Sequence, residues 1–453
     1  MDCISVILAV GGETRMKSKT PKALHEAAGL PILEWVLRAV RAADTKKDIL
    51  VLGDAYDEIE GRYGGEVVCV RQSGCLGSGH AVMGARQYLE GFCGYVLIVA
   101  GDMPLLTGGT MRKLVDEAAR GDYDCMLLSA RLADPSGYGR VLRDSAGDVL
   151  AIVEERDATA EQRKVDEVHT SCYCVKNDVL QKYLDKLQPK NAQNEYYLTD
   201  IVELVREGGG KVGALRVADH RDCMRVHDRA QLAEASGLLR ARINLAHMQN
   251  GVTLADPNAV YIGPDVTIGR DTVVHPGVTL EGNCVIGEDV TLYPGSRIVS
   301  SEIGNGASVQ NSVLLCAKVG NNTTVGPYAY LRPGTVLGDH CRVGDFVEVK
   351  NSNIGDGTKV SHLTYIGDAD LGKNINVGCG VVFVNYDGKK KHRSTVGDNV
   401  FIGCNTNLVS PVEVGEGAYI AAGATITADV PARSLAIARA RQVIKEGWKD
   451  KRE

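Results

Sequence analysis

Aliphatic residues recur at every sixth position through most of the second half of the chain. Small or turn-forming residues fill the positions between them, as in "IGPDVTIGRD" (262–271). Such a repeat is typical of a hexapeptide β-helix, in which three hexads form one triangular coil and the aliphatic side chains stack inside. One interruption, "NYDGKKKHRS" (385–394), predicts an external loop. The repeat comprises Ile262, Ile268, Val274, Leu280, Ile286, Leu292, Ile298, Val319, Val325, Leu331, Leu337, Val343, Val349, Val360, Ile366, Val377, Phe383, Val396, Ile402, Leu408, Val414, Ile420 and Ile426.

The first half alternates short apolar runs with segments of helical periodicity. This alternation predicts an α/β, Rossmann-like domain with a parallel sheet covered by helices on both faces. Ligands of such sheets bind beyond the carboxyl ends of the strands, which places Gly11, Gln72 and Asp102 on a common rim. The predicted strands are 5–10, 48–54, 67–72, 95–102 and 123–130, and the predicted helices are 31–43, 79–90 and 110–120.

Residues 229–249 predict one long helix between the two halves. Asp228 stands at the N-cap position and Gln231 follows three residues later, the spacing of a capping box. Asn250 and Gly251 end the helix. We therefore expect a first domain over 1–228, a linker helix over 229–250 and a β-helix domain over 251–453.

Length and composition exclude several classes of protein for this chain. A chain of 453 residues is too long for one ordinary core. Its formal net charge of -6 argues against nucleic-acid partners, and its longest apolar run, residues 95–100, is too short for membrane insertion. The N-terminus lacks a basic region, so we expect no signal peptide. Thirteen cysteines without a CxxC pair favour reduced thiols in the cytoplasm and argue against a zinc site.

Polar residues that the repeat does not require point to chemistry in the β-helix. Arg332 and Lys350 are 18 residues apart, one predicted coil, so we expect them to stack as a doubled cationic site for a phosphate monoester. His362 is a candidate general base, which Glu348 could orient. Alone, His362 is more simply a surface histidine and lysines 389–391 a solvated loop. Joined to the stacked cations and to the interrupting loop, His362 favours a site, whereas a phosphorylated cofactor could use the lysines of the loop.

Short motifs along nearly the whole chain resemble one enzyme family. In the second half these are "LRPG" (331–334), "SHLTYIGDA" (361–369), "NYDG" (385–388), "LAIAR" (435–439) and "KEGW" (445–448). In the first half they are "LAVGGETRM" (8–16), "RQSGCLGSGHA" (71–81), "AGDMPLL" (100–106), "DPSGYGRV" (134–141) and "NEYYLTDIV" (194–202). The chain thus resembles the bacterial bifunctional N-acetylglucosamine-1-phosphate uridyltransferase / glucosamine-1-phosphate N-acetyltransferase. The resemblance implies a left-handed β-helix and a homotrimer.

For the second half, the resemblance implies acetyl transfer from acetyl-CoA to glucosamine 1-phosphate. His362 would take the proton of the attacking amine. The sugar phosphate would be bound by Arg332, Lys350, Tyr365 and Asn376. The residues that would bind acetyl-CoA are Cys379, Asn385, Tyr386, Cys404, Ala422 and Arg439.

For the first half, the resemblance implies transfer of a uridylyl group from UTP to N-acetylglucosamine 1-phosphate. Arg15 and Lys22 would hold the UTP phosphates, and Asp102 with His227 would hold Mg²⁺. The residues that would bind UTP or the product UDP-N-acetylglucosamine are Leu8, Ala9, Val10, Gly11, Arg15, Lys22, Gln72, Gly77, Ser78, Ala100, Gly101, Asp102, Gly139, Glu154, His169 and His227.

Four positions in the first half depart from the family pattern. Glu13 replaces a glycine of the phosphate loop, and Ala100 replaces a tyrosine found in some relatives. His169 and His227 replace asparagines that bind sugar and metal. Imidazole suits Zn²⁺ or Mn²⁺ better than Mg²⁺. We expect the loop to hold nucleotide still, because Arg15, Lys22 and Asp102 remain.

Three hypotheses stay open at this point. The first is a bifunctional enzyme of UDP-N-acetylglucosamine synthesis. The second keeps the acetyltransferase but has an impaired, metal-altered or differently specific nucleotidyltransferase head. The third is a trimeric β-helix scaffold without chemistry, because a repeat alone does not specify a reaction.

Overall fold

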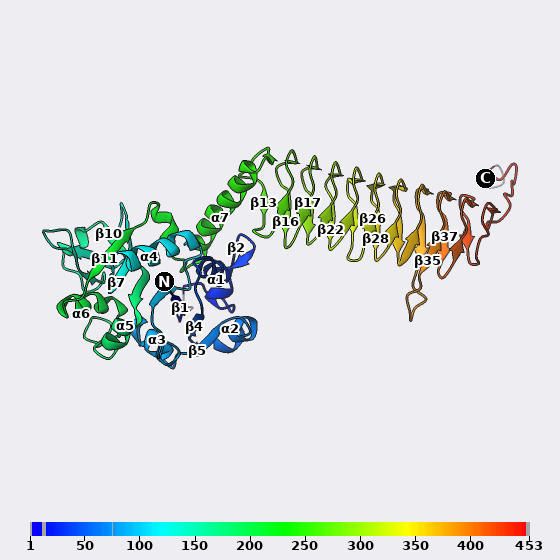
Figure 1. Cartoon of the computed structure of the whole chain (residues 1–453). Coiled ribbons are helices and arrows are strands. Elements are labelled where there is room, and N and C mark those ends of the chain that lie inside the picture. Colours follow the sequence, from blue (N-terminus) through cyan, green and yellow to red (C-terminus); the bar gives the residue numbers. More distant parts are fainter. Residues whose placement is uncertain (1, 11–14, 75, 450–453) are drawn as a thin grey trace. The chain divides into compact units, whose positions relative to one another are not determined.

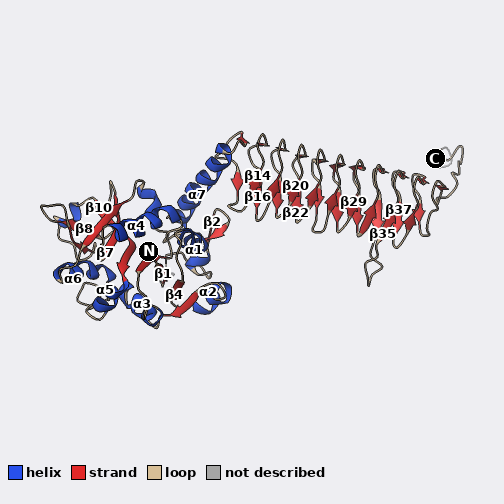
Figure 2. Cartoon of the chain, in the orientation of Figure 1, coloured by secondary structure: helices blue, strands red, loops and turns tan. Residues whose placement is uncertain are grey.

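The computed structural model describes residues 2–10, 15–74 and 76–449 and divides into two compact units, 1–239 and 240–453 (Figure 1). Helix α7 (Arg229–Gln249) contributes residues to both units. Helices and strands alternate in the first unit, whereas short strands alone form the coils of the second (Figure 2). Gly11 and Glu13 of the predicted phosphate loop lie outside the described residues.

The first unit is built on one sheet, with the strands in the order β11-β7-β10-β6-β1-β4-β5. β1 pairs in parallel with β4 and β6, as the alternating pattern predicts. The strand bounds are β1 (Cys3–Ala9), β4 (Asp48–Leu52), β5 (Val68–Arg71), β6 (Tyr95–Ala100), β7 (Cys125–Arg131) and β11 (Val212–Arg216).

The prediction of an all-parallel sheet is wrong, because the sheet is mixed. β10 (Glu167–Lys176) runs antiparallel to both β6 and β7. It follows the antiparallel pair β8 (Arg140–Arg143) and β9 (Val149–Val153) instead of a crossover helix. A parallel neighbour requires a crossover connection, whereas a hairpin reverses the chain.

Helices cover both faces of this sheet. Alternate residues of a strand face opposite sides: Ile7 of β1 packs with the helices of one face and Val6 with those of the other. α1 (Ile32–Ala42), α2 (Tyr56–Tyr63) and α4 (Gly108–Arg120) cover the first face. The second face is covered by α3 (Ser78–Ala85), α5 (Asn177–Leu184) and α6 (Ile201–Glu207).

Helix α7 begins and packs as its sequence predicts. Asp228 Oδ1 accepts a hydrogen bond of 2.8 Å from the Gln231 amide, which confirms the predicted cap. In the first unit, Ala235 and Leu239 of α7 pack in a buried cluster with Val226. In the second unit, Asn244 Nδ2 donates 2.7 Å to the carbonyl of Pro257 at the start of the β-helix.

The second unit is a parallel β-helix with three sheets as its faces. Face I runs from β12 (Thr253–Leu254) to β41 (Leu435–Ala436), and face II from β13 (Tyr261–Ile262) to β40 (Thr425–Ile426). Face III runs from β14 (Thr267–Ile268) to β38 (Glu413–Val414). The predicted aliphatic residues all belong to its single core, with Ile268 partly buried.

The coils do not all contain 18 residues. Thr279 pairs with Arg297, 18 positions on, but Arg297 pairs with Val313, only 16 positions on. The predicted loop 385–394 leaves the stack before β35 (Ser394–Val396), where it projects from the coils (Figure 1). Shorter coils shift every later alignment, so vertical neighbours cannot be found by counting in eighteens.

Two further expectations concern the chain as a whole. The cysteines in the described part of the chain are free thiols. No helix of the described residues combines the length and the apolar character needed to cross a membrane.

Truncation inside the β-helix tests the role of its core. Phe383 in β34 (Val382–Val384) is fully buried. Phe383→Ala should lower the free energy of unfolding by about 3–5 kcal/mol, because it removes buried apolar area and leaves a cavity. Urea unfolding followed by circular dichroism measures the effect. Val285→Ala, at a residue 52% exposed, is the control and should change stability by less than about 0.5 kcal/mol.

Candidate functional site

A cleft of about 910 Å³ opens in the first unit. It brings together every described residue for which the sequence predicts nucleotide or product binding. These residues are Leu8, Ala9, Val10, Arg15, Lys22, Gln72, Gly77, Ser78, Ala100, Gly101, Asp102, Gly139, Glu154, His169 and His227. Tyr197 and Thr199 line it as well.

Glycines allow the backbone to approach closely at this rim. Gly101 follows β6, and a Cβ there would lie 3.0 Å from the Ala9 Cβ at the end of β1. Gly77 has a φ of 105°, and its Cβ would come 2.6 Å from the carbonyl oxygen of Tyr196. Larger residues would therefore push these segments apart.

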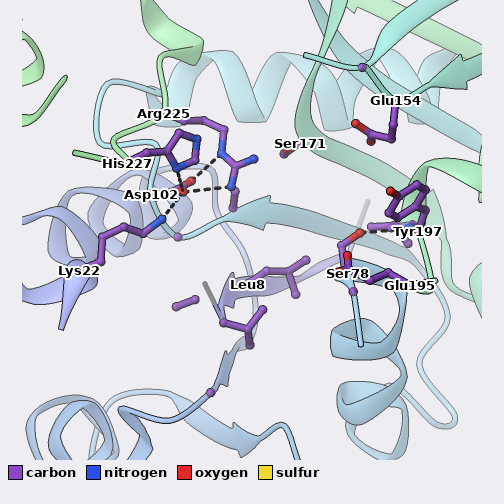
Figure 3. A pocket seen from close by; sticks show the side chains of 18 of the residues that line it. Leu8, Lys22, Ser78, Asp102, Glu154, Ser171, Glu195, Tyr197, Arg225 and His227 are labelled. Atoms are coloured by element: carbon purple, nitrogen blue, oxygen red, sulfur yellow. Dashed lines mark hydrogen bonds and ion pairs between the residues drawn. The ribbon is translucent and has the colours of Figure 1, made fainter. Parts of the chain in front are cut away.

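Asp102, buried at the end of β6, is the centre of a charged cluster. Its carboxylate lies 2.6 Å from Lys22 Nζ and accepts two bonds from Arg225, 2.9 Å from Nε and 3.0 Å from Nη2. His227 Nδ1 lies 3.5 Å from Oδ2. Figure 3 shows all three side chains converging on Asp102. Burial raises the pKa of the Asp102 carboxyl, but the charges of Arg225 and Lys22 outweigh it and hold that pKa well below its usual range.

Arg225 is a residue of the cleft that sequence reasoning missed. It lies two positions before His227, in a segment without regular periodicity, and it follows no predicted strand. The one available signal was its place next to a predicted metal ligand. Its charge also reaches Tyr138, Glu154 and His169 across the cleft.

His169 and Glu154 are two titratable groups that line the cleft on the side opposite Asp102. Burial and then the charge of Arg225 lower the pKa of His169 to about 3. Its Nδ1 lies 3.1 Å from the Ser171 amide and accepts that hydrogen bond. Burial raises the pKa of Glu154. His169 is therefore a neutral hydrogen-bonding group at neutral pH.

Gln72 offers an unsatisfied acceptor to the cleft. Its Nε2 lies 2.8 Å from His80 Nδ1. Its Oε1 is buried and finds no hydrogen-bond partner among the described residues. A buried amide oxygen without a partner is costly, so this atom suits a ligand N–H donor.

In the β-helix, His362 is oriented by a residue other than the one predicted. His362 ends β30 (Lys359–His362), and its Nδ1 lies 2.7 Å from Oδ1 of Asp345, its neighbour in β27 (Arg342–Asp345). This hydrogen bond lowers the pKa of the Asp345 carboxyl. The prediction for Glu348 is wrong, because Glu348 lies on face II and pairs with Arg332 at 2.8 Å.

His362 belongs to a column of residues at the end of the face I strands. The register places Cys379 beside His362 in the next coil, then Cys404 and Ala422 in the two coils that follow. The amide of Asn405, which follows Cys404, donates 2.7 Å to the carbonyl of Cys379. Arg439 Nη1 donates 2.7 Å to the Ala422 carbonyl. The predicted acetyl-CoA residues of this column are thus contiguous with the predicted base.

The predicted cationic pair does stack. Leu331 of β25 (Tyr330–Leu331) pairs with Val349 of β28 (Glu348–Lys350), so Arg332 and Lys350 are neighbours on face II. Lys350 Nζ lies 3.7 Å from the largely buried carboxylate of Asp368. Asn385 Nδ2 donates 2.5 Å to the same carboxylate and 3.4 Å to the hydroxyl of Tyr365.

Lys391 of the external loop joins this group, although the sequence predicts a solvated lysine there unless a phosphorylated cofactor uses it. The nearby Lys350 ammonium lowers the pKa of Lys391. An isolated antiparallel β-bridge between the backbones of Tyr386 and Lys391 closes the loop. We call Arg332, Lys350, Tyr365, Asn385 and Lys391 the face II cluster.

Within the described residues of one chain, no hydrogen bond or ion pair joins the His362 imidazole to the face II cluster. His362 ends a strand of face I, and its contacts are with Asp345 and Thr364. Asn376, which begins β33 (Asn376–Val377), also lies on face I, in register with Lys359 and Phe401. The predicted convergence of a guanidinium, an ammonium and an imidazole is therefore seen only for the two cations.

Comparison with known proteins gives matches for both halves. Residues 5–167 match the model of the MobA-like NTP transferase domain. Residues 265–300, 316–351 and 393–428 match the model of the bacterial transferase hexapeptide, six repeats.

Whole-length relatives share the same name, "Bifunctional protein GlmU". One from Acetivibrio thermocellus is 48% identical over 99% of this chain and 97% of its own length. Another from Caldanaerobacter subterraneus is 50% identical over 100% and 98%, and one from Clostridium novyi is 51% identical over 98% and 97%.

The buried neutral His169 predicts a pH-dependent stability. An unfolded histidine titrates near 6.5, whereas burial lowers the pKa of His169 to about 3. The unfolded chain therefore binds the proton more readily, and stability is lost as the pH falls below 6.5. His169→Gln should remove up to about 2 kcal/mol of the stability lost between pH 7 and pH 5.

Urea unfolding at the two pH values measures this difference. His220→Gln, at an exposed histidine of the same unit, is the matched control and should keep the wild-type pH dependence. An unchanged pH dependence in His169→Gln would contradict the prediction.

Proposed function

The chain belongs to the family of bacterial bifunctional N-acetylglucosamine-1-phosphate uridyltransferase / glucosamine-1-phosphate N-acetyltransferase enzymes, and from this premise we propose which residues carry each reaction. It is a transferase of UDP-N-acetylglucosamine synthesis for the cell wall, with a nucleotidyltransferase domain and a left-handed hexapeptide β-helix. This membership favours the bifunctional hypothesis over a scaffold without chemistry. We assign the uridylyl-transfer domain to 1–228, the linker to 229–250 and the acetyl-transfer domain to 251–453.

His362 is the general base of our acetyl-transfer proposal. The observation that carries it is the 2.7 Å hydrogen bond between Nδ1 and Asp345. With Nδ1–H donated to Asp345, Nε2 stays free to accept a proton. The amine of glucosamine 1-phosphate would attack the thioester carbon of acetyl-CoA and lose a proton to Nε2. The C–S bond would break, and coenzyme A would leave as the thiolate and then be protonated.

The two substrates of this reaction have separate sets of candidate contacts. The face II cluster offers three cations, Arg332, Lys350 and Lys391, to the phosphate of glucosamine 1-phosphate. We assign Tyr365 and Asn376 to the sugar phosphate as well. We assign acetyl-CoA to Cys379, Asn385, Tyr386, Cys404, Ala422 and Arg439.

A homotrimer would complete this site, because no hydrogen bond or ion pair joins His362 to the face II cluster within the described residues of one chain. The support is an apolar column beside His362, formed by Tyr328, Phe346 and Leu363. All three are more than half exposed and have φ between 44° and 59°, a conformation that bulky residues rarely adopt. The Tyr328 and Phe346 rings stack at 5.5 Å. An exposed apolar column held in this strained conformation suits a surface covered by neighbouring copies.

The cleft of the first unit is our candidate site for UTP and N-acetylglucosamine 1-phosphate. Gln72 Oε1 would accept the imide N–H of uracil, beside Gly77 and Ser78. Arg15 and Lys22 would bind phosphates. Gly139, Glu154 and His169, on the far side of the cleft, would contact the sugar.

The cluster around Asp102 does not fit Mg²⁺, the cofactor that the resemblance implies. Mg²⁺ takes oxygen ligands, but both oxygens of Asp102 are bonded to cationic groups. His227 offers nitrogen, and the described residues contain no group of three or more His, Cys, Asp or Glu side chains that could hold a metal. We therefore derive no catalytic step through Mg²⁺. We place the enzyme in the cytoplasm, where its free thiols would stay reduced.

Loss of the base tests the acetyl-transfer assignment. His362→Ala should lower the rate of coenzyme A release with glucosamine 1-phosphate by about 100-fold or more. Asp345→Asn should lower it by about tenfold, because the imidazole loses its orientation. Pyrophosphate release from UTP and N-acetylglucosamine 1-phosphate is the internal control and should stay at the wild-type rate. Full acetyl transfer by His362→Ala would refute the assignment.

Removal of one apolar side chain tests the trimer. Phe346→Asn keeps a residue that tolerates positive φ but deletes the exposed ring. It should raise the dissociation constant of the assembly, measured by sedimentation velocity, by about tenfold or more. The rate of acetyl transfer should fall in parallel. Val285→Asn removes an exposed apolar residue of face III and should leave assembly intact. A wild-type chain that sediments as a monomer would contradict the proposed homotrimer.

A further inference from the structure

The cluster around Asp102 carries more positive than negative charge. The buried carboxylate of Asp102 faces two permanent cations, the Lys22 ammonium at 2.6 Å and the Arg225 guanidinium at 2.9 Å and 3.0 Å. One negative charge thus faces two positive charges. A site for a divalent cation needs the opposite balance, because like charges at such distances repel. This cluster suits an anion.

The geometry of Arg225 also favours an anion over a divalent cation at this cluster. Its Nε and Nη2 bind the two different oxygens of Asp102, the paired arrangement in which a guanidinium covers both sides of a carboxylate. A metal could reach Asp102 only after Arg225 had moved. Asp102 in turn fixes the guanidinium in one orientation inside the cleft.

Arg225 keeps donors for a second partner. Guanidinium has five N–H groups, and towards the described residues the recorded hydrogen bonds of Arg225 use only Nε and Nη2. Its side chain is one-third exposed and lines the cleft. Figure 3 shows it between Asp102 and the side of the cleft that holds Glu154. Its free donors are therefore available to phosphate oxygens within the cleft.

We propose that the Arg225 guanidinium, anchored by Asp102, binds the reacting phosphates in the place of a protein-bound divalent cation. This inference rests on the uridylyl transfer assigned to the cleft. An oxygen of the sugar 1-phosphate forms a bond to the α-phosphorus of UTP. The bond from that phosphorus to the bridging oxygen breaks, and pyrophosphate leaves with the electron pair. Arg225 and Lys22 neutralise the charge of the phosphate oxygens.

Chelation tests the proposal on the full chain. Pyrophosphate release from UTP and N-acetylglucosamine 1-phosphate is measured in excess EDTA and in Mg²⁺. In excess EDTA, the wild type should release pyrophosphate at no less than about a tenth of its rate in Mg²⁺. Arg225→Met should lose about 100-fold in EDTA, because its side chain has similar length but no charge, and Mg²⁺ should restore part of the rate.

Mn²⁺ binding gives a readout independent of turnover. Water proton relaxation during Mn²⁺ titration should show a site in Arg225→Met that binds about tenfold tighter than any site in the wild type, because Asp102 is uncovered. Arg221→Met is the matched control. Arg221 lies in the same segment and pairs with Asp219 at 2.6 Å, and its loss should change neither measurement. Urea unfolding followed by circular dichroism verifies that the first unit of each variant is folded, and coenzyme A release verifies that its β-helix is intact.

Two results would overturn the inference. One is a wild-type chain whose pyrophosphate release is abolished by EDTA while Arg225→Met behaves identically. The other is equal Mn²⁺ affinity in wild type and Arg225→Met. If no chain releases pyrophosphate under any condition, the uridylyl-transfer assignment fails instead, and the Mn²⁺ comparison alone decides the role of Arg225.

Discussion

The β-helix depends on one constraint: each coil must keep its hydrogen-bonded register with the next while its aliphatic residues stack inside. This register turns positions far apart in the sequence into vertical neighbours. It places Asp345, His362 and Cys379 in successive coils, although 17 residues separate each from the next. The same rule stacks Arg332 on Lys350. Function here follows from which residue occupies a given position in each coil.

The sequence predicted this architecture well because its signal is periodic. Buried aliphatic positions such as Val274 and Leu280 recur every six residues within each run of coils, and a repeat of this length is hard to imitate by chance. The alignment of the shorter coils was harder to predict, because a break in the six-residue spacing does not say which residues of neighbouring coils pair. Glu348 is predicted as the partner of His362 because it lies two residues from Lys350, whereas the register between coils selects Asp345.

The first unit shows a different limit of sequence-based prediction. Gln72 and Asp102 could be placed on the rim because each follows a recognisable strand. Arg225 could not, because its position depends on the tertiary packing of an irregular segment, whose Val226 packs with Ala235 and Leu239 of α7. The antiparallel direction of β10 was missed for a related reason: it is set by the β8–β9 hairpin and not by any property of the β10 residues themselves.

Both candidate sites hold their cations in the same way. Asp102 fixes Lys22 and Arg225, Glu348 fixes Arg332, and Asp368 lies beside Lys350. A long basic side chain loses conformational entropy when it binds a phosphate, and a carboxylate that already holds it has met part of that cost during folding. The carboxylate also weakens the local positive field, so the arrangement favours phosphate only where cations outnumber acids. At Asp102 two cations face one acid. These carboxylates are therefore best understood as anchors for the cations that we assign to phosphate binding.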